Sequence, residues 1–308
     1  EQGVALLVDD VAAVQPGQTL GSLVDIERIE ILRGPQSTLF GKNASAGVIS
    51  ITTKAPSATF EGSMEATATD DGETGVVGSV SGPIMDDLRY RLTGNWNDRD
   101  GYIHNLTPNV DDKNGARVKN LRGTLDWDIT DSATLKFSAY SMKDKSKCCA
   151  LTWESMPLGN SILGLPIGYP ADDISPGKDN FAFHGEDGPY STSESIVGSV
   201  RFNPAVGEFE LASISALDNW NYDIQEDVDF SDLDVLGFFS GDLEQGGWYS
   251  SGEISTSFYS QEFRLLSPSY EKYEYLVGLY YANAKTTEYF FRNLSLALAD
   301  NDTTAKTE

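Results

Sequence analysis

The sequence predicts a mainly β protein in two parts: a small mixed α/β segment at the N-terminus and then an antiparallel meander of about nine long strands. Three observations lead to this prediction. From residue 60 onward, apolar and polar residues alternate with a period of two, as in strands with one apolar face. Short turns alternate with long polar connections, and aromatic residues recur near the expected strand ends. These features are typical of part of a transmembrane antiparallel β-barrel.

Composition narrows the class of protein. The chain has 308 residues with 47 acidic and 22 basic side chains, which gives a net charge of −25. Such an acidic surface repels phosphate backbones, so we expect no nucleic-acid partner. No stretch reaches the roughly 18 consecutive apolar residues of a membrane-spanning helix. The chain starts at Glu1 without a recognisable signal peptide, so we expect an internal piece of a longer protein.

The first 56 residues contain the elements of a small α/β unit. The apolar run Gly3–Val11 predicts a strand that ends in an Asp-Asp turn, and Pro16-Gly17 is the next break. Apolar residues from Leu20 to Ile26 have helix-like spacing. The alternation changes to the long meander pattern after Pro56, which predicts the end of this unit.

The segment Asp25–Lys54 is the best defined part of this unit. Ile29–Leu32 alternates and is rich in β-branched residues, which predicts a short strand. Residues 36–40 have room for one helical turn, since the proline before them suits the first helical position and the glycine after them suits the end. Val48–Thr53 is almost purely β-branched and predicts a second short strand.

The long strands are expected where apolar and polar residues alternate. Leu88, Tyr90 and Leu92, for example, alternate with Arg89 and Arg91. The expected strands lie near residues 60–68, 76–84, 88–96, 121–129, 135–139, 196–202, 209–222, 258–266 and 272–291. This layout favours a meander in which each strand pairs with the next.

The connections between these strands are sorted by length. The long connections lie at about residues 98–116, 143–192 and 223–247, and short turns separate them. All long loops therefore fall at one end, as in outer-membrane barrels with brief periplasmic turns. Aromatic residues recur near the strand ends, as an interfacial girdle requires. They are Trp96, Tyr102, Trp127, Tyr140, Trp220, Tyr222, Tyr289 and Phe290.

Two stretches resemble one known family. The first comprises residues 27–36 (ERIEILRGPQ), Leu39-Phe40-Gly41 and Gly47-Val48-Ile49-Ser50, in this order and spacing. It resembles the plug domain of TonB-dependent outer-membrane receptors, except that Ala46 replaces a usual glycine and Ser50 a frequent Asn. The plug motif residues are Glu27, Arg28, Glu30, Arg33, Gly34, Pro35, Gln36, Gly41 and Gly47. The second stretch, residues 260–281, is similar to a strand pair in the barrel of the same receptors.

The resemblance implies a plugged transmembrane antiparallel β-barrel. Residues 1–56 are then expected to be the C-terminal half of a small α/β plug domain inside the lumen. Residues 57–308 are expected to be the N-terminal part of the barrel. Outer-membrane transporters of this kind close with 22 strands, so about nine strands form only part of the wall.

The resemblance also implies a function. It points to an active-transport receptor in the outer membrane of a bacterial cell, with no enzymatic activity and no cofactor. The implied partners are outer-membrane lipid and the TonB energy-coupling complex, which binds a segment, the TonB box, that is missing here. A third implied partner is a scarce nutrient such as an iron chelate, for example a siderophore complex, or cobalamin or an oligosaccharide. The sequence leaves the ligand and its binding residues open.

Charged residues suggest how the plug is held in the barrel. We expect buried ion pairs between charges of the plug motif strand and charges of the lumen wall, with plain surface charge as the alternative. The plug set is Glu27, Arg28, Glu30 and Arg33, and the wall set is Glu61, Glu65, Arg89 and Arg91. Such pairs contribute little net stability, yet removal of one partner costs several kcal/mol. They would suit an element that is rearranged by an applied force.

Catalytic and metal sites have little support. Both histidines, His104 and His184, fall in expected loops, and the sequence has no His-x-x-x-His, nucleophile-elbow or phosphate-loop motif. The acidic run at residues 226–234 is more simply an exposed loop than a calcium site. Its weak candidate ligands are Asp227, Asp229, Asp232 and Asp234. The adjacent Cys148 and Cys149 can pair with each other, pair elsewhere or stay free, and metal binding is disfavoured.

Two other functions fit a β-rich acidic chain. A secreted soluble β-rich binding or adhesion module needs its outward apolar faces packed against a second sheet. An extracellular carbohydrate-active enzyme needs a pair of catalytic carboxylates, but neighbouring acids mean little in so acidic a chain. Extraction only with detergent would favour the receptor over both.

Overall fold

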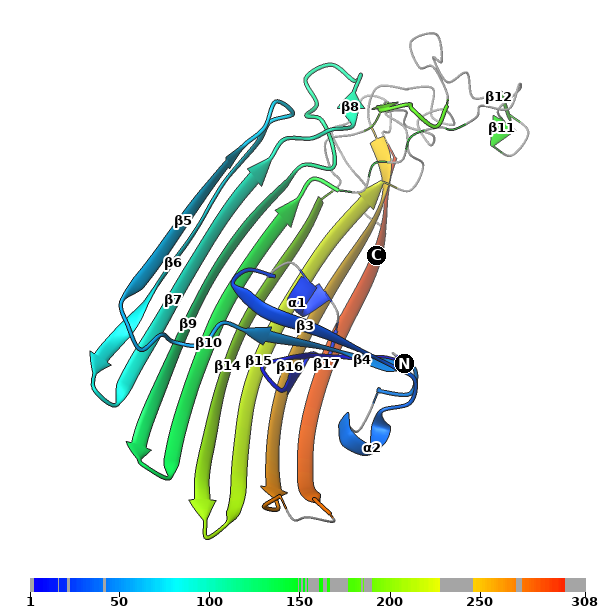
Figure 1. Cartoon of the computed structure of the whole chain (residues 1–308). Coiled ribbons are helices and arrows are strands. Elements are labelled where there is room, and N and C mark those ends of the chain that lie inside the picture. Colours follow the sequence, from blue (N-terminus) through cyan, green and yellow to red (C-terminus); the bar gives the residue numbers. More distant parts are fainter. Residues whose placement is uncertain are drawn as a thin grey trace.

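The chain forms two main sheets in the computed structural model (Figure 1). The structure describes residues 3–15, 17–20, 23–40, 43–148, 150, 152, 154, 161–162, 165–166, 177–183, 185, 190–227, 246–269 and 273–296. Among these residues, no helix is both long enough and apolar enough to pass through a membrane. The small N-terminal sheet and the large sheet that follows it are described in turn.

A four-stranded sheet forms the N-terminal unit, with strand order β2-β1-β4-β3. Its strands are β1 (Val4–Val8), β2 (Val11–Ala12), β3 (Ile26–Arg33) and β4 (Gly47–Thr53). β1 and β4 pair in parallel, whereas β1 with β2 and β3 with β4 are antiparallel. The core of the unit lies on the central strands, and its buried members are Ala5, Leu7, Ala44 and Val48 with Phe40 packed against them.

Two short helices complete the N-terminal unit: α1 (Gly17–Leu20) and α2 (Ser37–Phe40). α2 is the single turn expected after Pro35, and the backbone N–H of Gln36 donates to the carbonyl of Ala44 at 2.8 Å. The helix expected between Leu20 and Ile26 is wrong, because α1 ends at Leu20. Helices this short are marginal in water, and Ile26 instead begins the ladder with β4.

The large sheet, called the wall from here on, has nine strands in the order β17-β16-β15-β14-β10-β9-β7-β6-β5. All of its pairings are antiparallel. The strands are β5 (Glu61–Ala68), β6 (Glu73–Met85), β7 (Leu88–Arg99), β9 (Ala116–Thr130), β10 (Ala133–Ser146), β14 (Tyr190–Val206), β15 (Phe209–Asp227), β16 (Gly246–Leu266) and β17 (Leu276–Leu296). The predicted nine-stranded meander is therefore confirmed.

The connections of the wall are sorted by length, with one exception. At one end they are short, at residues 86–87, 131–132, 207–208 and 267–275. At the opposite end they are long, at residues 100–115, 147–189 and 228–245, but the β5–β6 connection at this end spans only residues 69–72. Figure 1 shows β8, β11 and β12, which belong to the first two long connections, beyond one rim of the wall.

Several strands run further than their apolar alternation predicts. β10 extends to Ser146, although the expected strand ends near Ala139, and β16 begins at Gly246 rather than near Phe258. The ladder is built from backbone groups, so polar strand ends continue to pair where apolar side chains are no longer present. The strands consequently reach well past the apolar band toward the long loops.

The two faces of the wall differ in chemistry. Large apolar side chains remain exposed on one face, among them Leu92, Leu121, Leu125, Phe137, Ile196, Val200 and Leu217. The opposite face, called the polar face, is largely buried and has Arg91, Thr93, Arg122, Thr124 and Ser138 among its members, together with some buried apolar side chains such as Met142, Ile214 and Trp220. The N-terminal unit lies across the polar face (Figure 1), and its side chains bond to these residues. The apolar face is called the outer face from here on.

The long connections carry four two-residue strands. β8 (His104–Asn105) pairs in parallel with β13 (Ala182–Phe183), and β11 (Ser161–Ile162) pairs with β12 (Leu165–Pro166). Cys148 is disulfide-bonded, whereas Cys149 and His184 lie outside the described residues. The β8–β13 ladder joins the first long connection to the second, whereas β11 and β12 both belong to the second.

Candidate functional site: the interface between the N-terminal unit and the wall

Three aspartates of the N-terminal unit bond to arginines on the polar face of the wall. Asp9 and Asp10 form the turn between β1 and β2, and Asp25 directly precedes β3. Their partners come from β7, β9, β14 and β16, and these are Arg91, Arg122, Arg201 and Arg264. We call these three residues the anchor aspartates. They tie one small unit to four separate strands.

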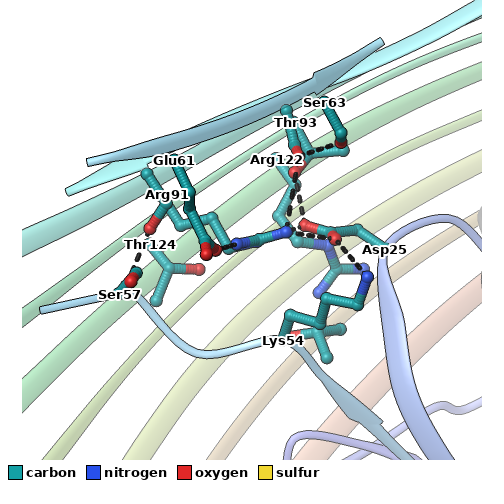
Figure 2. A network of polar contacts seen from close by, with 12 residues as sticks. Asp25, Lys54, Ser57, Glu61, Ser63, Arg91, Thr93, Arg122 and Thr124 are labelled. Carbon is teal, nitrogen blue, oxygen red and sulfur yellow. Dashed lines mark hydrogen bonds and ion pairs between the residues drawn. The ribbon is translucent and has the colours of Figure 1, made fainter. Parts of the chain in front are cut away.

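Asp25 has the best-formed contacts of the three. The guanidinium of Arg91 donates two hydrogen bonds to its carboxylate, from Nε to Oδ2 and from a terminal nitrogen to Oδ1, both at 2.6 Å. Thr93 donates a third at 2.5 Å, and Lys54 lies 3.8 Å away. Figure 2 shows these side chains converging on Asp25 from β7 and from the end of β4. The fork-to-fork geometry is that of a strong charge-assisted pair.

The Asp25–Arg91 pair is buried. Both side chains are 7% exposed, so neither charge is well solvated. Arg91 has one further carboxylate partner, Glu61 on β5 at 2.9 Å, whose side chain is 54% exposed, and it also donates to the Ser79 hydroxyl at 3.4 Å. The buried pair therefore reaches solvent through two half-exposed groups, Glu61 beside Arg91 and Lys54 beside Asp25, and loss of Asp25 would leave Arg91 with Glu61 as its carboxylate partner.

Asp25 titrates at a lower pH than an ordinary aspartate. Burial raises the pKa of its carboxyl, but hydrogen bonds from Arg91 and Thr93 and the charges of Arg91 and Lys54 lower it more. The net pKa therefore lies below the usual 3.8. The carboxylate form is the one the interface stabilises, so the pair is intact at neutral pH.

Asp9 joins the end of β4 to the wall. Its carboxylate accepts from the backbone N–H of Thr53 at 3.0 Å and from the Thr53 hydroxyl at 2.7 Å. Arg122 of β9 donates to the same carboxylate at 3.5 Å and stacks over Tyr140, with 4.9 Å from the guanidinium carbon to the ring centre. The Tyr140 hydroxyl donates to the backbone carbonyl of Gln18 at 3.2 Å. One wall arginine thus lies at the centre of contacts to two segments of the N-terminal unit.

Asp10 bonds to two arginines at once. Arg201 of β14 donates to one carboxylate oxygen and Arg264 of β16 to the other, the latter at 3.2 Å. Arg264 also forms two hydrogen bonds to Glu262 on its own strand, at 2.7 and 2.9 Å. These groups are about one quarter to one third exposed, so this contact is wetter than that of Asp25.

All three anchor aspartates adopt left-handed backbone conformations. Their φ angles are 49° for Asp9, 69° for Asp10 and 58° for Asp25. The two-residue turn between β1 and β2 requires positive φ at both positions, where glycine or asparagine is usually favoured. Aspartate tolerates this conformation because its short polar side chain can bond locally. Here the same residues also present a carboxylate to the wall, which a glycine could not do.

The charges of the predicted plug motif strand do not reach the wall. Arg28 pairs only with its strand neighbours, at 3.9 Å from Glu27 and 3.2 Å from Glu30, and all three side chains are about half exposed. Arg33 is also exposed. The expected plug-to-wall pairs are therefore wrong for β3, because β3 is the edge strand of the small sheet. Of the predicted wall residues, Arg91 does pair with the N-terminal unit, but its partner is Asp25, which is not one of the predicted plug charges, and Glu61 pairs with Arg91 inside the wall.

The other two predicted wall residues, Arg89 and Glu65, form no described contact with the N-terminal unit. Arg89 pairs with Asp128 at 2.9 Å on a neighbouring strand pair. Glu65 lies on β5 and is exposed. Neither residue contributes to the contact with the N-terminal unit in the described contacts.

Two glycines of the predicted motif have clear local roles. Gly34 follows β3 with a φ of 86°, a region that glycine occupies without strain, and a Cβ there would meet no atom within 4 Å. Gly47 opens β4, and a Cβ there would lie 2.6 Å from the carbonyl oxygen of Leu32. The first is a conformational requirement and the second a steric one. Gly41, at the end of α2, lies outside the described residues.

The candidate calcium ligands receive no support. Asp227 ends β15, whereas Asp229, Asp232 and Asp234 lie outside the described residues. Within the part of the chain that is described, no group of three or more His, Cys, Asp or Glu side chains has the arrangement of a metal site.

The sequence did carry a signal for the anchors. An Asp-Asp pair between two apolar runs predicts a tight turn, and an aspartate before a strand is a frequent turn residue. What no local pattern reports is the partner, because Asp25 and Arg91 are 66 residues apart and Asp10 and Arg264 are 254 apart.

Comparison with known proteins identifies the N-terminal unit. Residues 1–48 match the TonB-dependent Receptor Plug Domain family. The chain is 33% identical over 129 residues to the ferric enterobactin receptor PirA of Pseudomonas aeruginosa, a match covering 37% of this chain and 17% of that protein. It is 30% identical over 178 residues to the ferrioxamine B receptor of Salmonella typhimurium, covering 56% of this chain and 22% of that protein.

Solved structures share the fold over almost the whole chain. The ferric yersiniabactin uptake receptor FyuA of Yersinia pestis superposes with a TM-score of 0.73 and 21% identity, covering 95% of this chain and 41% of that one. The open form of the ferric-catecholate import receptor Fiu of E. coli K12 gives a TM-score of 0.71 and 13% identity, covering 97% and 45%. The matches thus span about a fifth of the curated relatives and under half of these solved chains. Residues 1–48 therefore match a TonB-dependent receptor plug domain, and nearly the whole chain has the fold of these solved receptors.

Proposed function

We propose that this protein is an outer-membrane active-transport receptor that imports a ferric siderophore. The relatives are named as receptors for ferric enterobactin and ferrioxamine B, and the structural neighbours as receptors for ferric yersiniabactin and ferric catecholates. All four names describe iron held by a small organic chelator. An iron chelate is therefore the preferred ligand over cobalamin or an oligosaccharide.

We assign residues 1–56 to the plug and residues 57–308 to the barrel. The four-stranded sheet ends at Thr53 and the first wall strand begins at Glu61, which supports a division between them. The exposed apolar outer face would lie against the lipid of the bacterial outer membrane, and the long connections would project from the cell. The plug motif residues, Glu27 to Gln36 with Gly41 and Gly47, would shape the plug around its strand-to-turn junction.

Transport requires the plug to move relative to the barrel, and the anchor aspartates are proposed to set the resistance to that movement. A buried ion pair contributes little net stability but is costly to break on one side. Such contacts keep the plug seated under thermal agitation and release it when an external force acts. The TonB complex would supply this force through a segment outside this chain.

One observation carries the proposal: a small unit is ion-paired to the polar face of a sheet whose opposite face is apolar and exposed. A soluble binding module would bury that apolar face against a second sheet. Among the described residues, the only other sizeable sheet lies on the polar face. A carbohydrate-active enzyme is not favoured, since the related proteins are named as receptors.

Growth and uptake assays test the proposal. Deletion of the gene in its own host should abolish uptake of at least one ⁵⁵Fe-loaded siderophore from a panel of catecholate and hydroxamate types. Uptake should return with the wild-type gene and should stop when the proton gradient is dissipated, whereas surface binding of the chelate persists. Unchanged uptake of every siderophore after deletion, or protein that is monodisperse without detergent, would overturn the assignment.

A further inference from the structure

The outer face of the wall changes from apolar to basic between two neighbouring rows of side chains. The directly opposite residues of β9 and β10, from the short-turn end upward, are Trp127 with Leu135, Leu125 with Phe137, Gly123 with Ala139, Leu121 with Ser141, Lys119 with Lys143, and Arg117 with Lys145. The first four rows are apolar or small, and the next two are entirely cationic. We call Arg117, Lys119, Lys143 and Lys145 the basic patch.

The basic patch lies directly beyond the apolar rows. Successive rows are two residues apart, or about 6.8 Å along a strand, so four apolar rows cover about 20 to 25 Å of strand. Barrel strands tilt by about 35 to 45°, so these rows account for about 15 to 20 Å of the roughly 25 Å apolar band of outer-membrane barrels, and the patch falls near its edge. Trp96 lies opposite Lys119 on β7 and is 37% exposed, as an aromatic residue at the lipid–water boundary would be.

The charge arrangement of the patch is unfavourable without an anion. Like charges directly opposite on paired strands destabilise a sheet, and the patch contains two such pairs in adjacent rows. Asp98 pairs with Arg117 at 2.5 Å and Glu194 pairs with Lys143. Within the described residues, Lys119 and Lys145 have no carboxylate partner. This occurs in a chain whose net charge is −25.

The patch borders a cleft that can receive a headgroup. A cleft of ≈ 820 Å³ is lined by Arg117 and Lys145 together with Tyr190, Thr192 and residues of the first long connection. Acidic residues also line it; of these, Asp111 pairs with Lys147 and Asp112 with His104. Directly below the patch, Leu121 is 56% exposed and Ile196 is 65% exposed. A ligand with a phosphate beside an apolar tail would cover both surfaces.

We propose that the basic patch binds the phosphate groups of an anionic lipid in the membrane leaflet at the loop end of the barrel. This inference rests on the proposed membrane location but not on the transported ligand. The lipid phosphates neutralise Lys119 and Lys145, and the acyl chains lie along the apolar rows beneath them. A lipid headgroup is chosen over free phosphate because the patch adjoins the apolar band directly.

Native mass spectrometry of the detergent-purified protein tests this inference. The protein is titrated with lipid A, which carries two phosphates, with phosphatidylglycerol, with zwitterionic phosphatidylcholine and with inorganic phosphate. Each lysine near a membrane surface contributes about 1 kcal/mol to anionic lipid binding, which is about fivefold in affinity. The double variant Lys119→Gln/Lys145→Gln should therefore bind the anionic lipids about 30-fold more weakly. The matched control is Lys285→Gln, which removes an exposed outward lysine opposite Ser257 on β17, away from the basic patch, and should change binding less than twofold.

The outcomes separate this inference from the proposed function. Equal lipid binding by the double variant and wild type, equal binding of phosphatidylcholine, or full competition by millimolar inorganic phosphate would each overturn the lipid site. In lipid-free neutral detergent the double variant should be at least as thermostable as wild type, since it relieves like-charge repulsion; a clear loss of stability would contradict that reasoning. A protein that needs no detergent would instead refute the membrane location itself.

Discussion

The substitution Asp25→Asn isolates the contribution of one anchor to the seating of the plug. Asparagine has the same shape as aspartate and tolerates the left-handed backbone that Asp25 adopts, with a φ of 58°. The change therefore removes the charge and leaves the backbone conformation intact. Arg91, which is 7% exposed, then loses its main partner and retains Glu61 at the solvent edge.

The expected cost follows from this burial. Removing one partner of a buried ion pair costs about 3 to 5 kcal/mol. We expect the lower limit, about 3 kcal/mol, because Glu61 still neutralises part of the Arg91 charge. A change of about 3 kcal/mol raises the equilibrium constant for local opening of the plug about 100-fold.

Native-state hydrogen exchange gives the most direct readout. The backbone N–H of Lys54 donates to the carbonyl of Asp25 at 3.0 Å, so it reports the opening of this junction. In Asp25→Asn, a peptide covering residues 48–54 should exchange about 100-fold faster, while peptides from the centre of β15 and β16 should be unchanged. The difference between the two regions separates unseating of the plug from unfolding of the barrel.

A matched control and a double-mutant cycle make the test decisive. Glu27→Gln removes a carboxylate from the same unit, but its pair with Arg28 is 3.9 Å long and about half exposed, so exchange should change no more than about twofold. Asp25→Asn and Arg91→Gln should be strongly non-additive, since each removes the same contact. Additive effects, or no acceleration at residues 48–54, would refute the view that this pair holds the plug.

Three further predictions concern the same unit. The pKa of Asp25 is lowered by its partners, so its stabilisation is present above the unfolded pKa of about 3.9 and is lost as the pH falls through the lower folded pKa. The free energies of unfolding of wild type and Asp25→Asn, measured with denaturant, should therefore converge as the pH falls below about 3.9. A constant difference between them down to about pH 2.5 would argue against this role of Asp25. Gly47→Ala places a Cβ 2.6 Å from the Leu32 carbonyl oxygen and should destabilise the plug by about 1 to 3 kcal/mol. In the control Gly94→Ala the new Cβ meets nothing within 4 Å and should not strain its strand. Equal shifts in melting temperature for the two variants would contradict the steric explanation. Gly34→Val should destabilise the plug by about 1 to 2 kcal/mol and reduce siderophore uptake, and Gly34→Asn should do so less because Asn accepts positive φ; equal losses in uptake would show that φ is not the cause.

Much of the fold was predictable because apolar and polar residues alternate along the strands. The wall strands repeat an apolar-polar period of two, so their number and order follow from the sequence alone. The strand, turn, helical turn and strand between Ile26 and Thr53 were also predictable, since β-branched runs and a proline mark them. Strand ends were less predictable, because polar stretches such as Lys143–Ser146 pair through the backbone without an apolar signal.

For the contact between plug and barrel, the sequence predicts the type of interaction but not the residues that form it. Its chemistry, carboxylates of the plug against arginines of the wall, follows from charged residues on an enclosed polar face. The choice of Asp25 over Glu30 depends on which element faces the wall, and β3 lies at the edge of the small sheet. That placement is a long-range property, and neither spacing nor composition near residue 30 reports it.

The serial placement of the anchor aspartates along the chain has a mechanical consequence. If a pulling force acts on the N-terminal side of Val4, as the proposed transport step requires, it loads the turn at Asp9 and Asp10 before it reaches Asp25. The anchor aspartates would then separate from their arginines one after another and not all together. The largest force required would be set by the strongest single ion pair instead of by the sum of all of them. A moderate pulling force could therefore release the N-terminal unit from the wall.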